Sequence, residues 1–154
     1  MNDFTILYVE DEESDVTLLQ HVLAKTGICN VLQTVKDGKE ARDYLAGNPP
    51  YDQRAQHPLP GLVLLDLNLP YWSGFELLEW VRQQPHLRRL PVLIFTSSSR
   101  PDDIARAYDA GANAYLVKPN ALTDLTTLAL ALRDFWLLHN RFADSLGPRP
   151  ATPT

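Results

Sequence analysis

The sequence predicts an α/β protein with a doubly wound parallel sheet, and three observations support this. Short apolar runs alternate five times with stretches in which apolar residues recur at helical spacing. Most helical stretches are bounded by Gly or Pro, which end helices or begin them. Three apolar runs end in the charged residues Glu10, Asp66 and Lys118. In an open parallel sheet those ends lie together, at the edge where ligands bind.

Each predicted strand is a short run of apolar residues. In chain order these runs are residues 4–9, 31–35, 62–65, 92–95 and 115–117. Strands covered by helices on both faces have such continuous runs, whereas half-exposed strands alternate apolar and polar residues. Five strands joined by helical stretches therefore predict βα units and a parallel sheet.

Most of the predicted helices have apolar residues at a helical period and a Gly or Pro near one end. The helices are expected over about 16–26, 39–46, 74–84, 102–110 and 123–142. Gly27, Gly47 and Gly111 follow three of them, as is common just past a helix end. Pro85 stops the third helix, and Pro101 lies near the first turn of the fourth.

Two segments lie outside this alternation. Residues 48–60 contain four prolines and few apolar residues, which predicts a long loop. Residues 146–154 contain three prolines and are expected to form a disordered tail. We therefore expect one domain over residues 1–145.

The composition excludes several classes of protein. A net charge of −5, a pI of about 5.2 and the lack of a basic stripe argue against nucleic-acid binding. The single cysteine excludes a disulfide framework and fits a reducing compartment. The sequence shows no signal peptide and no apolar run that approaches the ~18 residues of a membrane span. These features predict a soluble, cytoplasmic protein.

The charged residues at the strand ends suggest a particular chemistry. Glu10, Asp11 and Asp66 would repel one another unless a cation or protons lay among them. Mg²⁺ suits one or two carboxylates together with phosphate oxygens. Lys118 adds a point positive charge and Thr96 a hydroxyl, so the set fits in-line phosphoryl transfer. Asp66, on the middle strand, is then the expected nucleophile.

Each of these residues has a structural alternative when it is taken alone. Asp66 could cap a loop, Lys118 could be a solvated lysine, and Tyr115 could be a strand residue with its hydroxyl at the rim. The acidic residues at positions 12, 13 and 15 could favour the first turn of a helix through its dipole. That explanation does not cover Glu10 and Asp11, which end a strand.

An ordered set of motifs carries a resemblance to a known family. The set consists of Glu10-Asp11, Asp66 with Asn68-Leu69-Pro70 and Gly74, Thr96-Ser97, and Gly111 to Pro119. On these motifs the chain resembles the receiver domains of bacterial two-component response regulators over about residues 4–140. The resemblance implies a flavodoxin-like receiver fold, with five parallel strands in the order 2-1-3-4-5 and helices on both faces.

The resemblance implies a role for each matching residue. Asp66 would accept a phosphoryl group from a kinase phosphohistidine. The metal site for Mg²⁺ would comprise Glu10, Asp11, Asp66 and the backbone carbonyl of Asn68, with Asp11 as a direct ligand and Glu10 holding a metal-bound water. The other implied roles are phosphoryl binding by Thr96, Ser97 and Lys118, a switch pair of Thr96 and Tyr115, and a cis peptide bond between Lys118 and Pro119. Such a protein is a phosphoacceptor and not an enzyme, although it assists its own phosphotransfer and dephosphorylation.

Finer features resemble stand-alone regulators that pair with bacterial and cyanobacterial phytochrome histidine kinases. They are Tyr8-Val9-Glu10-Asp11, the Pro-rich loop before the third strand, and Phe135-Trp136-Leu137. The resemblance implies a light-responsive sensor histidine kinase, such as a bacteriophytochrome, as the partner.

Two other classes of function remain open. One is a pseudo-receiver, a binding module that is not phosphorylated; such modules usually lack the acidic pair or the lysine, and this chain has both. The other is a haloacid-dehalogenase-type phosphatase, which needs a second Asp two residues after the nucleophile. That position holds Asn68.

The last predicted helix carries more apolar residues than one buried face requires. One stripe should face the sheet and consists of Leu125, Leu128, Ala129, Leu132, Phe135 and Trp136. Leu130 and Leu137 fall nearly opposite, and Leu138 extends the apolar flank. This pattern predicts a homodimer that uses the last helix. The alternative is a set of scattered surface leucines, which are common in monomers.

Overall fold

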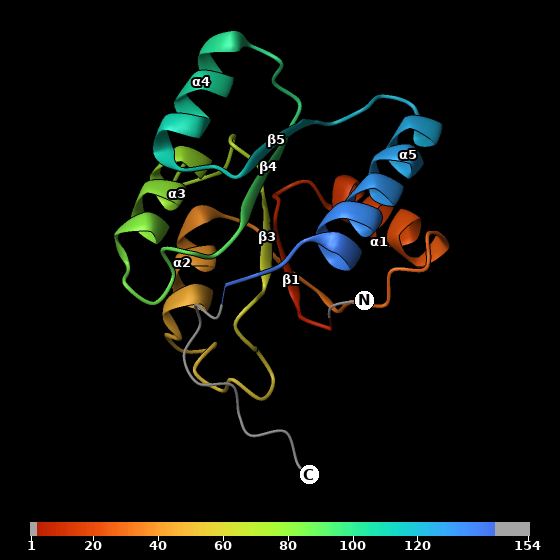
Figure 1. Ribbon diagram of the computed structural model, residues 1–154. Helices are drawn as coiled ribbons and strands as arrows, with labels where there is room; N and C mark the ends of the chain where they lie inside the picture. Colours follow the sequence, from red (N-terminus) through yellow and green to blue (C-terminus); the bar gives the residue numbers. More distant parts are fainter. Residues whose placement is uncertain (1–2, 144–154) are drawn as a thin grey trace.

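The computed structural model describes residues 3–143, in which five parallel strands form one sheet of order β2-β1-β3-β4-β5 (Figure 1). The strands are β1 (Ile6–Val9), β2 (Leu32–Val35), β3 (Leu62–Leu65), β4 (Val92–Thr96) and β5 (Ala114–Val117). The helices are α1 (Glu13–Lys25), α2 (Gly38–Ala46), α3 (Gly74–Gln83), α4 (Pro101–Ala110), α5 (Leu122–Leu132) and η1 (Arg133–His139). The predicted fold class and strand order are confirmed.

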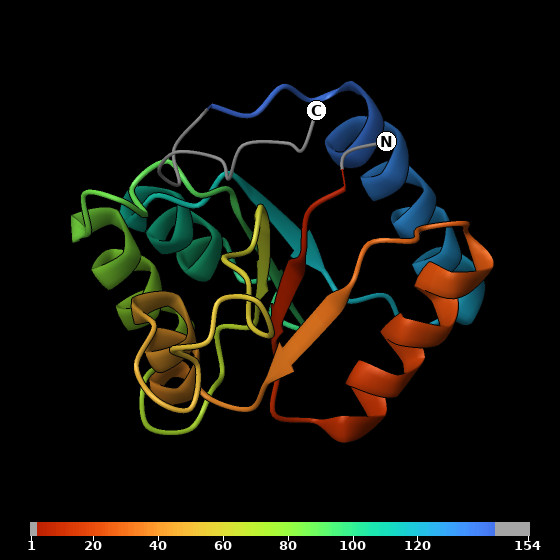
Figure 2. The same cartoon turned by 90° about the horizontal axis from the view of Figure 1, so that it is seen from below.

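The helices cover the two faces of the sheet in two groups. Helices α2, α3 and α4 lie on one face, and α1 and α5 lie on the other (Figure 2). Alternate residues of the strands point into the two cores, so that Leu7 and Val9 pack with the first group while Ile6 and Tyr8 pack with the second. Because both faces are covered, β1, β3 and β4 are buried along their whole length.

The loop before β3 contains no helix or strand, but hydrogen bonds fix its middle. The Arg54 guanidinium donates to the carbonyls of Tyr44 and Leu45 at 2.7 and 3.0 Å, and these carbonyls belong to the last turn of α2. Tyr44 in turn donates its hydroxyl to the Pro58 carbonyl at 2.8 Å. The loop therefore gives the Leu45 carbonyl a donor at the end of α2, and it gives a second donor to the Tyr44 carbonyl, which also accepts from the Gly47 amide.

The last helix differs from the prediction in its length and its geometry. The α-helix stops at Leu132, and η1 continues as a π-helix only to His139, where residue 142 was the expected end. A π-helix bonds residue i to i+5 and so turns through a smaller angle per residue than an α-helix. This change of phase carries Leu137 into the core, where it is 1% exposed, and leaves Phe135 56% exposed. The predicted apolar stripe is therefore correct up to Leu132 and wrong at Phe135.

Two further predictions concern the C-terminal tail and the absence of a membrane-spanning helix. The predicted disordered tail, residues 146–154, lies outside the described residues. Among residues 3–143, no helix is long and apolar enough to cross a membrane.

Candidate functional site

Four strand ends bring the predicted site residues to one edge of the sheet. Glu10, Asp66 and Lys118 each come directly after a strand, and Thr96 is the last residue of β4. The parallel ladders continue one step past the strands, since the Asp66 amide donates to the Val9 carbonyl at 3.1 Å and the Lys118 amide to the Thr96 carbonyl at 2.7 Å. The backbone itself therefore sets how far apart these side chains lie.

The segment after Asp66 turns sharply back over the site, and Gly74 permits this turn. A Cβ atom at residue 74 would lie 2.3 Å from the Asp66 carbonyl oxygen, which no side chain could tolerate. The Gly74 amide also donates to the Leu67 carbonyl at 3.0 Å. The glycine in the Asp66 motif is thus explained by the close approach of α3 to the backbone of the site.

Three carboxylates gather at this edge. Oxygens of Glu10, Asp11 and Asp66 all lie within 4.8 Å of one another. Glu10 and Asp66 are buried, while Asp11 is exposed. Hard oxygen donors at this spacing, open to solvent on one side, are the donor set that a small divalent cation prefers. The residues present therefore fit a divalent metal ion.

Lys118 lies among the acids and contacts three of them. Its ammonium donates to Asp66 Oδ2 at 2.8 Å, to Asp15 Oδ2 at 2.9 Å and to Glu10 Oε2. The Lys118 side chain is 12% exposed. Buried carboxylates need partners of this kind, because an isolated charge loses its hydration without compensation.

The second oxygen of Asp66 is also occupied. Asp66 Oδ1 accepts a hydrogen bond from the Thr96 hydroxyl at 2.9 Å and another from the Asn68 amide at 3.2 Å. Thr96 is fully buried, whereas Ser97 is exposed. The structure therefore brings Thr96 and Lys118 onto Asp66, and it leaves the phosphoryl contact of Ser97 and the metal contact of the Asn68 carbonyl as predictions.

Electrostatics distinguishes the two buried acids. Burial raises the pKa of Glu10 to about 7, an effect that the nearby Asp66 adds to and the Lys118 hydrogen bond only partly offsets. Burial would also raise the pKa of Asp66, but the hydrogen bonds from Lys118 and Glu10 outweigh it and lower that pKa. A lowered pKa keeps Asp66 ionised near neutral pH, which is the form a nucleophile needs.

Tyr115, the other member of the predicted switch pair, does not bond to Thr96. Its hydroxyl donates to the Ser98 carbonyl at 2.9 Å, and its ring is half buried against the α2–α3–α4 core. Ser98 lies two residues after Thr96, and its hydroxyl donates to Asp103 of α4 at 2.6 Å. Thr96 and Tyr115 are therefore linked through the segment between β4 and α4.

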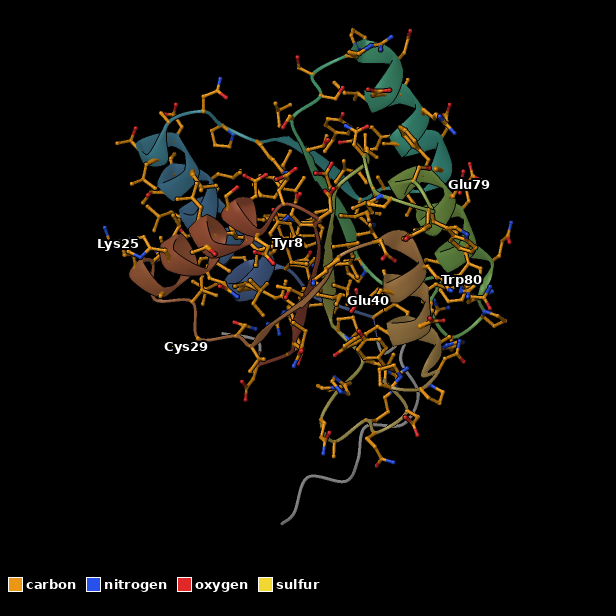
Figure 3. All side chains as sticks on the ribbon, turned by 180° about the vertical axis from the view of Figure 1, so that it is seen from behind. Tyr8, Lys25, Cys29, Glu40, Glu79 and Trp80 are labelled. Atoms are coloured by element: carbon orange, nitrogen blue, oxygen red, sulfur yellow. The ribbon has the colours of Figure 1, made fainter. Side chains whose placement is uncertain are left out.

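Two residues of the site are missing from the sequence-based prediction. The helix dipole accounts for Asp15 only in part, because Asp15 also contacts Lys118, and no spacing in the sequence indicates that contact. Tyr8 belongs to β1 and packs in the core on the α1–α5 side, and its hydroxyl donates to Glu10 Oε2 at 3.3 Å (Figure 3). No pattern in the sequence distinguishes this tyrosine from an ordinary core residue.

Two predictions about this region are wrong. The bond between Lys118 and Pro119 is not cis; among the described residues the cis bond is Pro49–Pro50. The trans form is the intrinsically favoured isomer, and it is compatible with the amide of Lys118 completing the ladder to β4. Leu137, expected at a dimer interface, is buried because η1 turns it toward the α1–α5 core.

Comparisons with known proteins agree on one family. The family model described as response regulator receiver domain matches residues 6–130. Response regulator Rcp1 of Synechocystis sp. is 39% identical over 132 residues, which cover 86% of this chain and 88% of Rcp1.

Solved structures give the same result. The Mn²⁺-bound form of Rcp1 has a TM-score of 0.82 at 36% identity, and the match covers 91% of this chain and 99% of the Rcp1 chain. The phosphorylated cyanobacterial phytochrome response regulator RcpA has a TM-score of 0.83 at 35% identity, and the match covers 92% of this chain and 99% of the RcpA chain. RPA3017, a response regulator in red light signaling of R. palustris, has a TM-score of 0.86 at 34% identity, and the match covers 90% of this chain and 97% of the RPA3017 chain.

Proposed function

This chain belongs to the response regulator receiver domain family, and we propose that it accepts a phosphoryl group on Asp66 from a histidine kinase. The observation that carries the proposal is the environment of Asp66. Its carboxylate is buried, kept ionised by Lys118, and contacted by the Thr96 hydroxyl on its other oxygen. A buried, ionised carboxylate with both positive charge and hydroxyl donors beside it suits attack on phosphorus.

The transfer can be written from the residues of this site. An Asp66 oxygen forms a bond to phosphorus while the P–N bond of the kinase phosphohistidine breaks, and the leaving imidazole nitrogen takes up a proton. Lys118 then directs a proton of its ammonium toward a phosphoryl oxygen, and Thr96 can donate its hydroxyl in the same way. Because the transferred group carries its charge on its equatorial oxygens, such donors stabilise it without any covalent step of their own.

The metal ion in this proposal is Mg²⁺. Glu10, Asp11 and Asp66 would hold it, with the Asn68 carbonyl as a further ligand. When bound, Mg²⁺ supplies positive charge between the carboxylates and the phosphoryl oxygens. Two observations support the proposal, namely the cluster of hard oxygen donors in this chain and the Mn²⁺-bound form in which the related Rcp1 crystallises.

The signal is proposed to leave the site through Thr96 and Tyr115. If the Thr96 hydroxyl turns from Asp66 to a phosphoryl oxygen, the segment after β4 must adjust. The Tyr115 hydroxyl is bonded to Ser98 of that segment, so the adjustment reaches β5 and α4. The output is then a changed surface for protein contacts, in the cytoplasm, without an enzymatic reaction of the protein's own.

A phytochrome-type histidine kinase is the proposed partner. Relatives at 34–35% identity include a cyanobacterial phytochrome response regulator and a regulator in red light signaling. Transfer from a purified, autophosphorylated phytochrome kinase should be faster than transfer from a histidine kinase of an unrelated system. Equal rates from both kinases would remove this assignment and leave the phosphoacceptor role intact.

A homodimer that uses the last helical segment is also proposed. Leu138 is 48% exposed and Phe135 56% exposed, while Leu130 is half-buried. The Phe135→Glu/Leu138→Glu double variant should sediment as a monomer at about 50 µM, where the wild type sediments as a dimer. A wild type that stays monomeric at that concentration, with or without phosphorylation, would exclude the dimer.

Phosphorylation itself is tested by intact mass. Incubation with acetyl phosphate and Mg²⁺ should add ~80 Da, the mass of one phosphoryl group, and a chelator should prevent the gain. No gain in the folded wild type would indicate a binding module, and repeated turnover of a phosphate ester would indicate a phosphatase. Either result would overturn the proposal.

A further inference from the structure

Asp15 contacts the site from a different element than the other acids do. Glu10 and Asp66 follow β1 and β3, whereas Asp15 lies in the first turn of α1. Its Oδ2 atom is 2.9 Å from the Lys118 Nζ atom, and its side chain is 39% exposed. Asp15 does not belong to the three-carboxylate cluster that fits a metal ion. Its contact with the site is therefore with the lysine.

The contact completes the hydrogen bonding of Lys118. An ammonium group has three protons to donate and no acceptor. In this structure one proton is directed to Asp66 Oδ2, one to Glu10 Oε2 and one to Asp15 Oδ2. With three acceptors for three protons, the position and the rotation of the ammonium are both defined. With only two acceptors, the group could rotate about them and move toward the open side.

The open side lies where Asp15 is found. A pocket of about 30 Å³ borders Lys118 between α1 and α5, and its lining includes Leu18, Leu19, Phe95 and Leu125. Asp15 is the one acidic residue in that lining. A lysine has four carbon–carbon torsions along its flexible stem, so an unoccupied space beside it allows it to move. The Asp15 carboxylate is the group that opposes this movement.

We propose that Asp15 is a positioning residue for phosphoryl transfer to Asp66, because it fixes the Lys118 ammonium from the α1 side. The inference rests on the proposed function. During transfer an Asp66 oxygen bonds to phosphorus, and the Lys118 proton that was directed at Asp66 turns to a phosphoryl oxygen. Glu10 and Asp15 keep the other two protons, so the ammonium does not have to be repositioned at the moment of reaction.

The test measures the rate of Asp66 phosphorylation with acetyl phosphate, at varied Mg²⁺, in three variants. In this reaction the bond from phosphorus to the acetate oxygen breaks and acetate leaves. Asp15→Ala removes the acceptor, Asp15→Asn keeps a neutral acceptor of the same shape, and Glu13→Ala removes an exposed acid of α1 as the matched charge control.

The expected result separates geometry from charge. At saturating Mg²⁺ and acetyl phosphate, Asp15→Ala should slow the reaction about tenfold and Asp15→Asn about threefold, since misplaced groups lose their effect steeply. The Mg²⁺ concentration that gives half of the maximal rate should stay within about twofold of the wild-type value in all variants. Glu13→Ala should react at the wild-type rate. If Asp15→Ala fails to fold, the partial loss in Asp15→Asn still carries the test.

Three results would overturn the inference. They are an unchanged saturated rate in both Asp15 variants, a loss that higher Mg²⁺ fully restores, and an equal loss in Glu13→Ala. The first means that Lys118 needs no third acceptor, and the other two mean that only the charge of Asp15 matters. A wild type that takes up no phosphoryl group would instead remove the proposed function, and this inference with it.

Discussion

The carboxyl edge of the sheet and the last helical segment depart in opposite directions from the usual distribution of side chains. At the edge, Glu10 and Asp66 are carboxylates that are almost fully buried; along η1, Phe135 and Leu138 are large apolar residues that are half exposed. The buried acids have their partners in the same chain, namely Lys118, Thr96 and Tyr8. Exposed apolar area is buried only if a second surface covers it. The buried acids thus have partners within a single copy of the protein, whereas the exposed side chains of Phe135 and Leu138 would be covered only by a second surface.

The largest effect should come from removing Lys118, the cation that pairs with Glu10 and Asp66 at the carboxyl edge. Lys118→Met leaves Glu10 and Asp66 with repelling, desolvated charges, so urea unfolding at pH 8 should show a loss of about 4 kcal/mol. Without the lysine the pKa of Glu10, already raised by burial, rises further, and the pKa of Asp66 loses the hydrogen bond that lowers it, so proton uptake at acidic pH relieves the repulsion. The loss should therefore be smaller at pH 5 than at pH 8.

A matched control shows whether that loss belongs to the site. Lys25 is an exposed lysine at the end of α1, visible in Figure 3, and Lys25→Met should change the stability by less than about 0.5 kcal/mol. A Lys118→Met loss that is the same at both pH values would contradict the account, because apolar packing does not titrate.

The next effect concerns the two neighbours Leu137 and Leu138. Leu137→Ala should cost about 3 kcal/mol because it leaves a cavity in the α1–α5 core, whereas Leu138→Ala should cost less than about 0.5 kcal/mol in the monomer. Urea unfolding of dilute protein measures both. Similar costs for the two variants would mean that η1 is not a π-helix and that the comparison between the regions is wrong.

A smaller effect is expected on Mg²⁺ affinity when Glu10 and Asp11, which follow β1, are substituted one at a time. Asp11→Asn should weaken Mg²⁺ binding by about thirtyfold, because a direct carboxylate ligand acts at contact distance. Glu10→Gln should weaken it by only a few-fold, because an acid that acts through a bound water contributes less. Calorimetric titration measures both affinities, and equal losses would overturn this ranking of the ligands.

The smallest effect is a pH dependence of metal binding. Because burial raises the pKa of Glu10 to about 7, a proton competes with the metal ion below that pH and has left above it. Mg²⁺ affinity should therefore rise by a few-fold from pH 6 to pH 8, by no more than the loss expected in Glu10→Gln, as one proton is displaced. In Glu10→Gln that rise should disappear, and a rise that persists there would assign the proton to another group.

The two regions also differ in how far the sequence predicts them. The strand ends are predictable because a parallel sheet aligns its carboxyl ends, so Glu10, Asp66, Thr96 and Lys118 converge once the βα alternation is recognised. Which side chains of η1 face the core is not predictable, because no pattern in residues 133–139 indicates the change from α-helical to π-helical geometry. This change in helix geometry makes Leu137 buried and Phe135 exposed, which is the reverse of the prediction.

Contacts of long side chains mark a second limit. The pairing of Asp15 with Lys118 joins residues 103 positions apart, and it depends on how α1 lies over the sheet. The dipole explanation for Asp15 is physically sound and incomplete, since one carboxylate can favour a helix start and bind a lysine at once. The isomer of the Lys118–Pro119 bond likewise depends on tertiary context, because the intrinsic preference is small.

Every role proposed for this site depends on Asp66 being the phosphoacceptor, and peptide mapping tests this directly. Protein treated with acetyl phosphate and Mg²⁺ is digested, and the fragment that carries the ~80 Da addition is identified by mass. The addition should lie on the fragment containing Asp66, Asp66→Asn should take up none, and a chelator should prevent it. An addition on any other fragment, or one that persists in Asp66→Asn, would contradict this role of Asp66.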